Sequence, residues 1–418
     1  MALQHPPPRL HAEHPSRMFT PWTLLCGLAA ALALGVCVWV STGIRGHDGL
    51  YNDFYIYWGG ARLLAHHHTP YDIAAIRAVV TGAHEQVLYG LGYTYPLLFC
   101  ILLIPLGLLP AQMAAAIFSG ISLAAFILAV AVLTSLMHRV RRWEQALFAV
   151  VAGTFIPVTG SFYFGQANLI VLLLLAVALA GAARGVCLAL SAAIKLYPLA
   201  GLGALLWPGD RNWRQLGVGI AATFVLAMLP NLLLDQGTHD LGRMFTPDSF
   251  WTNHSVDGAL SRLVAFGPPA LRQVPVTPTM FALAAAIGLA GLAVVLLARG
   301  RPWDGSMALL MTCAVMVAPR NSLWNFAPLL LALAWCLPRV HRRPLLLLPL
   351  VLGWGLIELQ GWVDIDLRPH LALATPLALL SSLALLGALL VAALQAYLML
   401  SPGERGAAEA VALSGDGP

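Results

Sequence analysis

Long apolar runs recur along this chain, and they constrain its fold more than any other feature. A helix crosses the roughly 30 Å hydrocarbon core of a bilayer with about 17–25 such residues. Runs that approach or reach this length are centred on 20–41, 93–110, 112–137, 145–160, 167–183, 185–207, 214–234, 279–298, 305–320, 323–338, 344–360 and 371–399. The sequence therefore predicts an all-α polytopic membrane protein with about twelve transmembrane helices.

The low charge content excludes a soluble globular protein. Charged residues make up 10% of the chain and hydrophobic residues 59%, whereas a soluble domain carries about 25% charged residues.

The run 20–41 lacks a small-residue cleavage pattern, so we interpret it as a retained signal anchor. The tails 1–17 and 402–418 are rich in Pro, Gly and Ala and are predicted to be disordered. The chain has no nucleotide-binding glycine loop. No nucleic-acid partner is expected.

Arginine clusters set the expected orientation, because cytoplasmic loops are enriched in basic residues. Arginines precede the first run and recur within 211–214, 299–301 and 339–343. With these segments inside, the loops 42–92, 235–278 and 361–370 face outward. The basic segment 138–143 then falls on the wrong side. Either it lies at the outer interface, or a short pair such as 97–109 with 112–136 crosses only once.

The two long outer loops are expected to be partly ordered. In the first, 53–65 has helical composition apart from its glycines, and 72–88 alternates apolar and polar residues at helical spacing. These patterns predict two juxtamembrane helices in the first outer loop. The second loop is interrupted by five prolines, so it is predicted to form a cap with one short helix over about 256–266.

Lys195 is the only lysine of the chain, and it stands within the apolar run 185–207. A cation at membrane depth costs roughly 2.5–3.5 kcal/mol on insertion scales, so it marks a candidate site. The alternative is that Lys195 extends its stem to an interface. From near mid-span it would have to reach about 16 Å at 1.5 Å per residue, which is farther than a lysine extends. Pro198 predicts a kink beside it.

No metal or other cofactor is expected. The six cysteines lie within apolar runs and form no CxxC pair, so they are interpreted as small core residues. His66, His67 and His68 are consecutive on a predicted turn and cannot all converge on one ion. No other set of histidines and carboxylates has ligand spacing.

A series of short motifs, taken in order over residues 50 to 330, resembles glycosyltransferase family 87, a polyprenol-phosphate-sugar-dependent, α-mannosyltransferase-like group of the GT-C superfamily. The motifs are Asp53-Phe-x-x-Tyr57, Pro70-Tyr-Asp72, Tyr95-Pro-x-Leu-Phe99, Gly165-Gln-x-Asn168, Lys195-Leu-Tyr-Pro198, and Asn253-x-Ser255 followed by Arg262. The chain departs from the family pattern at Asn321-Ser-Leu-Trp-Asn325, where no histidine follows the tryptophan, and at Asn253-His-Ser255, where the family has Asn-Gln-Ser.

The resemblance implies a GT-C-type bundle that moves one hexose, with mannose as the expected sugar, from a polyprenyl-phosphate donor to a lipid or glycan acceptor outside the cytoplasm. Asp53 lies where the family's catalytic Asp lies, and it is the candidate general base; the alternative is that it only caps its helix. Lys195 and Arg262 are expected to bind the donor phosphate.

Further polar and aromatic residues are candidates for substrate binding. The amides are equally compatible with hydrogen bonds between helices, and tryptophan is more often an interfacial anchor than a sugar platform. These candidates are Tyr57, Gln166, Asn168, Tyr197, Asn253, His254, Asn321, Trp324 and Asn325.

Two other functions stay open from the sequence. Lys195 and Arg262 would also suit a transporter or flippase of an anionic lipid-linked sugar, although no counterpart of Lys195-x-x-Pro198 occurs in the second half. The missing histidine keeps open a second alternative, in which the protein binds the donor but is catalytically idle.

The expected organisation is a catalytic transmembrane module, 18–278, and a C-terminal transmembrane module, 279–401, in contact with membrane lipids. The Ala-, Leu- and Arg-rich composition favours a bacterial plasma membrane.

Overall fold

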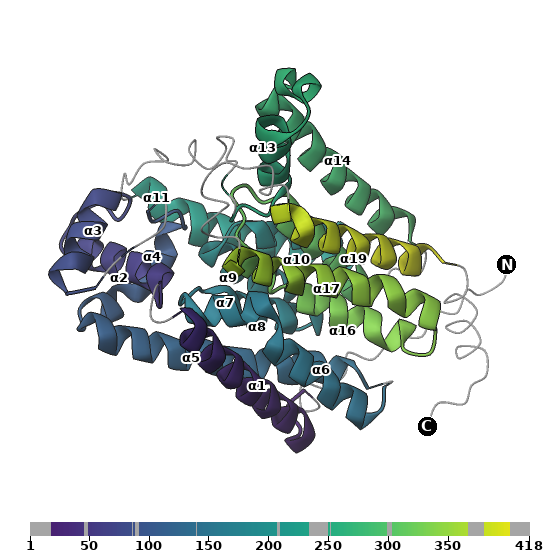
Figure 1. Ribbon diagram of the computed structural model, residues 1–418. Coiled ribbons are helices and arrows are strands. Elements are labelled where there is room, and N and C mark those ends of the chain that lie inside the picture. Colours follow the sequence, from purple (N-terminus) through teal and green to yellow (C-terminus); the bar gives the residue numbers. More distant parts are fainter. Residues whose placement is uncertain are drawn as a thin grey trace.

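The computed structural model describes residues 18–45, 49–85, 87, 92–138, 140–206, 210–233, 250, 252–298, 303–366 and 380–401. Helices account for the regular structure of these residues, and no strand occurs among them (Figure 1). The two tails that were predicted to be disordered lie outside the described residues, as does the segment 234–249. The expected all-α architecture is confirmed for the described part of the chain.

The helices follow the apolar runs in order. They are α1 (Pro21–Arg45), α2 (Asn52–Ala65), α3 (Ile73–Gly82), α4 (Leu97–Gly107), α5 (Ala111–Leu136), α6 (Arg142–Thr154), α7 (Ile156–Tyr163), α8 (Asn168–Leu179), α9 (Arg184–Ile194), η2 (Tyr197–Leu205), α10 (Asp210–Thr223), η3 (Phe224–Met228), α11 (Leu229–Leu233), α13 (Val256–Phe266), η4 (Pro269–Gln273), α14 (Val276–Leu297), α15 (Trp303–Val317), η5 (Leu323–Phe326), α16 (Leu329–Val340), α17 (Pro344–Asp366) and α19 (Leu383–Leu400).

Fewer of these helices are long enough to cross a membrane than the sequence predicted. Seven helical segments of the described residues have the length and hydropathy of a span, or eight if α6 and α7, which meet at a 47° bend, count as one. The count of about twelve is not confirmed, because α4, α8, α9 and α15 have only 11–15 residues. α4 covers about 16 Å at 1.5 Å per residue, about half of the roughly 30 Å hydrocarbon core, whereas α5 has the length of a span by itself. The side on which 138–143 lies stays a prediction.

Helices occur in both loops, although α3 ends earlier than the predicted 72–88, and the juxtamembrane placement of α2 and α3 stays a prediction. α2 and α3 lie together at the left-hand end of the bundle in Figure 1, and α13 covers Val256–Phe266. Asp72 caps α3 by accepting from the backbone N–H groups of Ala74 and Ala75, and Ser255 caps α13 by accepting from Gly258. Ser and Asp favour this position because their side-chain oxygens satisfy N–H groups that the first turn leaves unpaired.

α17 is longer than the sequence predicted. The run was expected to end at 360 and to pass into an outer loop, but the helix continues to Asp366. Residues 361–366 contain no proline, and the Gln360 amide donates to the Asp364 carboxylate one turn later at 2.8 Å. Asp364 is therefore a buried helical residue and not a solvated loop residue.

Small residues let the helices approach closely. Gly353 of α17 and Gly387 of α19 face each other's backbone, so a Cβ at either would come within 3 Å of the other's carbonyl oxygen. A Cβ at Gly153 of α6 would lie 2.2 Å from the carbonyl oxygen of Ala30 in α1. Such contacts are typical of membrane helices, whose association relies on close packing because lipid tails are as apolar as the side chains.

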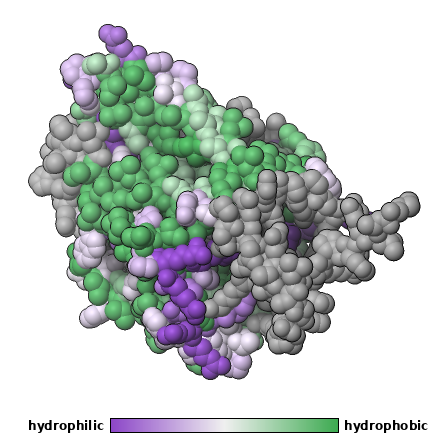
Figure 2. All heavy atoms as spheres, turned by 90° about the vertical axis from the view of Figure 1, so that its right-hand side faces the viewer, coloured by the Kyte–Doolittle hydropathy of each residue, from purple (hydrophilic) through white to green (hydrophobic). Residues whose placement is uncertain are grey.

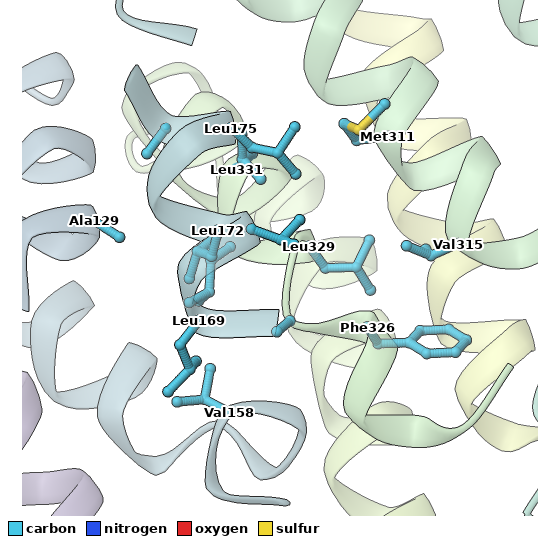
Figure 3. Packing of buried hydrophobic residues seen from close by; sticks show 14 of the residues in the cluster. Ala129, Val158, Leu169, Leu172, Leu175, Met311, Val315, Phe326, Leu329 and Leu331 are labelled. Atoms are coloured by element: carbon cyan, nitrogen blue, oxygen red, sulfur yellow. The ribbon is translucent and has the colours of Figure 1, made fainter. Parts of the chain in front are cut away.

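The buried core joins both halves of the chain. Leu169, Leu172 and Leu175 on α8 lie beside Leu329 and Leu331 of α16 in Figure 3. Large hydrophobic side chains also cover much of the outer surface, as the green areas of Figure 2 show. This distribution is the one expected of a multi-pass membrane protein. The division into modules 18–278 and 279–401 stays a prediction.

Candidate functional site

The start of α2 is held by the end of α7. The backbone N–H groups of Asp53 and Phe54 donate to the carbonyl oxygen of Phe164 at 3.0 and 3.3 Å, and Tyr51 donates to Tyr163 at 3.0 Å. The chain turns away immediately afterwards at Gly165, whose φ is +67°. A Cβ there would lie 2.6 Å from that of Phe54, so this junction requires glycine.

Asp53 does not cap α2. The N-cap is Tyr51, and no side chain satisfies the cap. This geometry excludes the alternative in which Asp53 serves only as the N-cap, and Asn52 does not take that place either, because it is the first helical residue. Instead, the Asn52 amide donates to Oδ1 of Asp53 at 3.0 Å. The Asp53 carboxylate is thus available for contacts outside its own helix.

Gln166 joins Asp53 to Lys195. The Nε2 atom of Gln166 donates to Oδ2 of Asp53, and its Oε1 accepts from Nζ of Lys195 at 2.7 Å. Burial raises the pKa of Asp53 above its ordinary value of 3.8, while the bonds from Gln166 and Asn52 and the charge of Lys195 act in the opposite direction. One amide therefore separates a carboxylate from a cation inside the protein.

Lys195 lies at a break and not within a kinked helix. α9 ends at Ile194, Lys195 itself is extended (φ −140°, ψ 136°), and the 3-10 helix η2 follows with Pro198 in its first turn. Proline is tolerated there because the first turn leaves its N–H groups unpaired. The side chain is 7% exposed. Lys195 therefore does not extend to an interface.

The ammonium group of Lys195 is surrounded by neutral groups. Besides Gln166, it donates to Oδ1 of Asn325 at 2.5 Å and lies 5.4 Å from the ring centre of Tyr95. Tyr95 accepts a hydrogen bond from the hydroxyl of buried Tyr57 at 2.9 Å. Tyr57 therefore orients Tyr95. Sequence reasoning missed Tyr95 as a site residue, although it belongs to one of the motifs.

Asn168 and Trp324 lie on the other side of Gln166. The Asn168 amide donates to the carbonyl oxygen of Trp324 at 2.9 Å and to Oγ of Ser161 at 3.0 Å. The Trp324 ring packs against Phe164 with 4.6 Å between ring centres. It also occupies the space where a Cβ of Gly160 would lie. These contacts fix η5 against α7, which is how Asn325 reaches Lys195. The hydroxyl of Tyr197 is buried without a hydrogen-bond partner among the described residues.

The other predicted residues form a second cluster, in the cap. Nη1 of Arg262 donates to the carbonyl oxygens of Asn253 and Phe250 at 2.6 and 3.0 Å. Its Nη2 donates to the carbonyl oxygen of Ser381 at 2.9 Å and to the hydroxyl of Ser382 at 3.2 Å. The guanidinium, expected to meet a phosphate, here holds the cap to the start of α19. Its phosphate contact stays a prediction.

His254 and Asn321 belong to the same cluster. The His254 ring contacts Oδ2 of Asp364 at 3.0 Å and the carbonyl oxygen of Ser381 at 2.9 Å, and its backbone N–H donates to Asn321 at 2.7 Å. The backbone N–H of Asn321 donates in turn to the Asn253 side chain at 3.1 Å. Sequence reasoning missed Asp364, although a Gln and an Asp at i, i+4 near an apolar run were a visible signal.

No group of three His, Cys, Asp or Glu side chains in the described part of the chain could hold a metal ion. What the site brings together is a carboxylate of raised pKa and a lysine on neutral acceptors, at one end of a membrane bundle. A carboxylate of perturbed pKa near a buried cation is a candidate functional site.

The model of glycosyltransferase family 87 matches residues 93–319, more than half of the chain. The chain therefore belongs to glycosyltransferase family 87, and the family implies a membrane glycosyltransferase. The match includes Gln166, Lys195 and Arg262 but ends before Asn325 and begins after Asp53. A search of curated proteins finds no match.

Proposed function

We propose that this protein transfers one hexose, with mannose as the first candidate, from a polyprenyl-phosphate donor to a hydroxyl of a lipid or glycan acceptor. The site would face outside the cytoplasm, in the plasma membrane, as in enzymes of GT-C type. The observation that carries the proposal is the connection of Asp53 to Lys195 through the single side chain of Gln166. A base and a cation are the two groups that this reaction needs.

Asp53 is the proposed general base. As the acceptor oxygen bonds to C1 of the sugar, the bond from C1 to the phosphate oxygen breaks, the configuration inverts, and the acceptor proton passes to Asp53. A positioned base contributes about 10²- to 10⁴-fold to the rate. Burial raises the pKa of Asp53, which makes the ionised carboxylate a stronger base.

Lys195 is the proposed partner of the leaving phosphate. An ammonium group has three N–H donors, and two of them go to the amide oxygens of Gln166 and Asn325. These neutral acceptors orient Nζ without neutralising its charge. A fixed cation in a dry site stabilises developing negative charge more strongly than it would in water. The third donor is thus available to a phosphate.

The contacts of the remaining site candidates separate residues that position Asp53 and Lys195 from residues that could contact the substrate. Gln166 and Asn325 are proposed to position Asp53 and Lys195, because their amide groups are already bound to them. The buried hydroxyl of Tyr197 has no partner among the described residues, so it is the strongest candidate for a substrate contact. Sugar contacts by Trp324 and the cap residues stay predictions.

The decisive experiment offers the purified protein a panel of synthetic polyprenyl-phosphate hexoses with membrane-lipid and glycan acceptors, and identifies the product by mass spectrometry. Transfer of one hexose that is lost in Asp53→Asn, with donor binding retained, supports the proposal. Donor binding without transfer to any acceptor contradicts the proposal and favours an idle relative. Movement of labelled donor between leaflets of proteoliposomes without transfer favours a flippase.

A further inference from the structure

The break between α6 and α7 is held by one face of α17. Trp354, Glu358 and Gly361 follow one another at i, i+4 and i+7, a spacing that places them on the same side of a helix. All three contact the break at Phe155 and Ile156. α17 lies outside the part of the chain that matches the family, and none of these residues was a site candidate from the sequence.

Each of the three makes a different contact with the break. The Trp354 ring stacks on Phe155 with 3.8 Å between ring centres. Oε1 of Glu358 accepts from the backbone N–H of Ile156 at 3.2 Å. Gly361 leaves room for the Ile156 side chain, because a Cβ there would lie 2.1 Å from Cδ1 of Ile156. Pro157, in the first turn of α7, sets where this helix begins, and the three contacts from α17 hold the direction in which α7 leaves α6.

An acidic side chain at the position of Glu358 costs free energy, which indicates that it has a structural or functional role. It lies within the candidate span Pro344–Asp364, where an acidic side chain is expensive and by default functional. The first turn of a helix has N–H groups without intrahelical partners, and Phe155, the N-cap of α7, offers no side-chain acceptor. The Glu358 carboxylate supplies that acceptor from a neighbouring helix.

The other end of α7 carries the proposed active site. α7 has eight residues, or about 12 Å at 1.5 Å per residue. The carbonyl oxygen of Tyr163 and that of the adjoining Phe164 hold the start of α2, on which Asp53 lies. The backbone N–H of Gln166 donates to Ser161 of α7 at 2.7 Å. A short rigid helix thus connects Glu358 to both Asp53 and Gln166.

We propose that Glu358 is a positioning residue for the transfer reaction: by accepting from Ile156, it sets the place of α7 and thereby of Asp53. This role rests on the proposed function of Asp53 as the base. Displacing a catalytic group by 1 Å can cost about 100-fold in rate. Loss of the acceptor at Glu358 should therefore lower kcat more than it changes the KM for the donor, because Asn325 still accepts from Lys195.

The first test compares Glu358→Gln, which keeps an acceptor oxygen, with Glu358→Ala, which does not. We expect Glu358→Gln to retain kcat within about threefold and Glu358→Ala to lose about 10- to 100-fold. Leu359→Ala is the matched control, because Leu359 is the next residue and is 49% exposed. Equal loss in the Gln and Ala variants, or an unchanged kcat in Glu358→Ala, overturns the proposal.

The second test moves the break while keeping the carboxylate. Gly361→Ala should lower kcat because its Cβ collides with the end of the Ile156 side chain, and the double variant Ile156→Ala with Gly361→Ala should recover it. Failure of the double variant to recover overturns the proposal. This comparison also tests whether the position of the break affects kcat if Glu358→Ala fails to fold.

A third readout does not depend on activity. Hydrogen exchange followed by mass spectrometry should show faster exchange in Glu358→Ala at α7 and also at Tyr51, Asp53 and Phe54, whose backbone N–H groups donate to Tyr163 and Phe164. An increase confined to α7 overturns the proposal. If the wild-type protein transfers no sugar, the proposed function fails, while this exchange pattern still tests whether Glu358 positions α2.

Discussion

Replacing Gln166 by Met should change the pH dependence of the enzyme in a defined direction. Met has a similar length but cannot donate to Asp53 or accept from Lys195 as Gln166 does. The bond from Gln166 favours the ionised carboxylate and lowers the pKa of Asp53. A hydrogen bond to a charged group is worth about 1.5–3 kcal/mol. Since 1.36 kcal/mol corresponds to one pKa unit, the pKa should rise by about one to two.

The assay is the pH profile of kcat with saturating donor and acceptor. The base must be ionised to accept a proton, so activity falls on the acid side as Asp53 becomes protonated. In Gln166→Met the acid limb should move upward by about one to two pH units, and raising the pH should restore part of the lost activity. Asn168→Ala is the control, because Asn168 bonds to Gln166, Ser161 and Trp324 but not to Asp53. An acid limb that stays in place or moves downward refutes the proposed connection between Gln166 and the base.

Three further variants test other parts of the site. Asp53→Asn should abolish transfer yet raise the Tm at neutral pH, because the folded-state pKa of Asp53 is raised and its ionisation therefore destabilises the fold. The difference in Tm between the variant and the wild type should disappear as the pH falls below 3.8, the pKa of the unfolded state. A lower Tm of the variant at neutral pH would contradict this reasoning. Lys195→Met should lower kcat/KM for the donor by at least about 10²-fold, as measured by initial rates, whereas a merely structural lysine would be replaceable without loss. Arg262→Met removes the hydrogen bonds from the guanidinium to the carbonyl oxygens of Asn253 and Ser381, each worth about 1.5–3 kcal/mol because the donor is charged. Thermal unfolding in detergent should therefore show a lower Tm; an intact Tm with a raised KM for the donor would instead support phosphate binding.

Local patterns were sufficient to place most helices. Apolar runs predicted the helical segments, and capping residues such as Asp72 and Ser255 marked where α3 and α13 begin. These features depend on residues close together in the chain. The lengths were less predictable: the bend between α6 and α7 and the end of α9 at Lys195 interrupt runs that are continuous in hydropathy.

The order of motifs identified the family, and the family match over 93–319 confirmed it. Order alone could not divide the candidates into a group around Asp53 and a group around Arg262. That division follows from contacts between segments far apart in sequence, such as Lys195 with Asn325 and Arg262 with Ser381. Buried arginine and lysine side chains both need hydrogen-bond acceptors, and the sequence does not show which acceptors lie close enough to bind them.

The sequence by itself determined that the chain is helical, spans a membrane and carries one lysine in an apolar setting, because these properties depend on composition and local spacing. Only the tertiary structure decided what surrounds that lysine. Gln166, from the turn after α7, and Asn325, from η5, meet at its ammonium group, and Glu358 of α17 holds the far end of α7. The break before α7 has a local cause in Pro157, but the close packing that brings these segments together has no counterpart in local sequence.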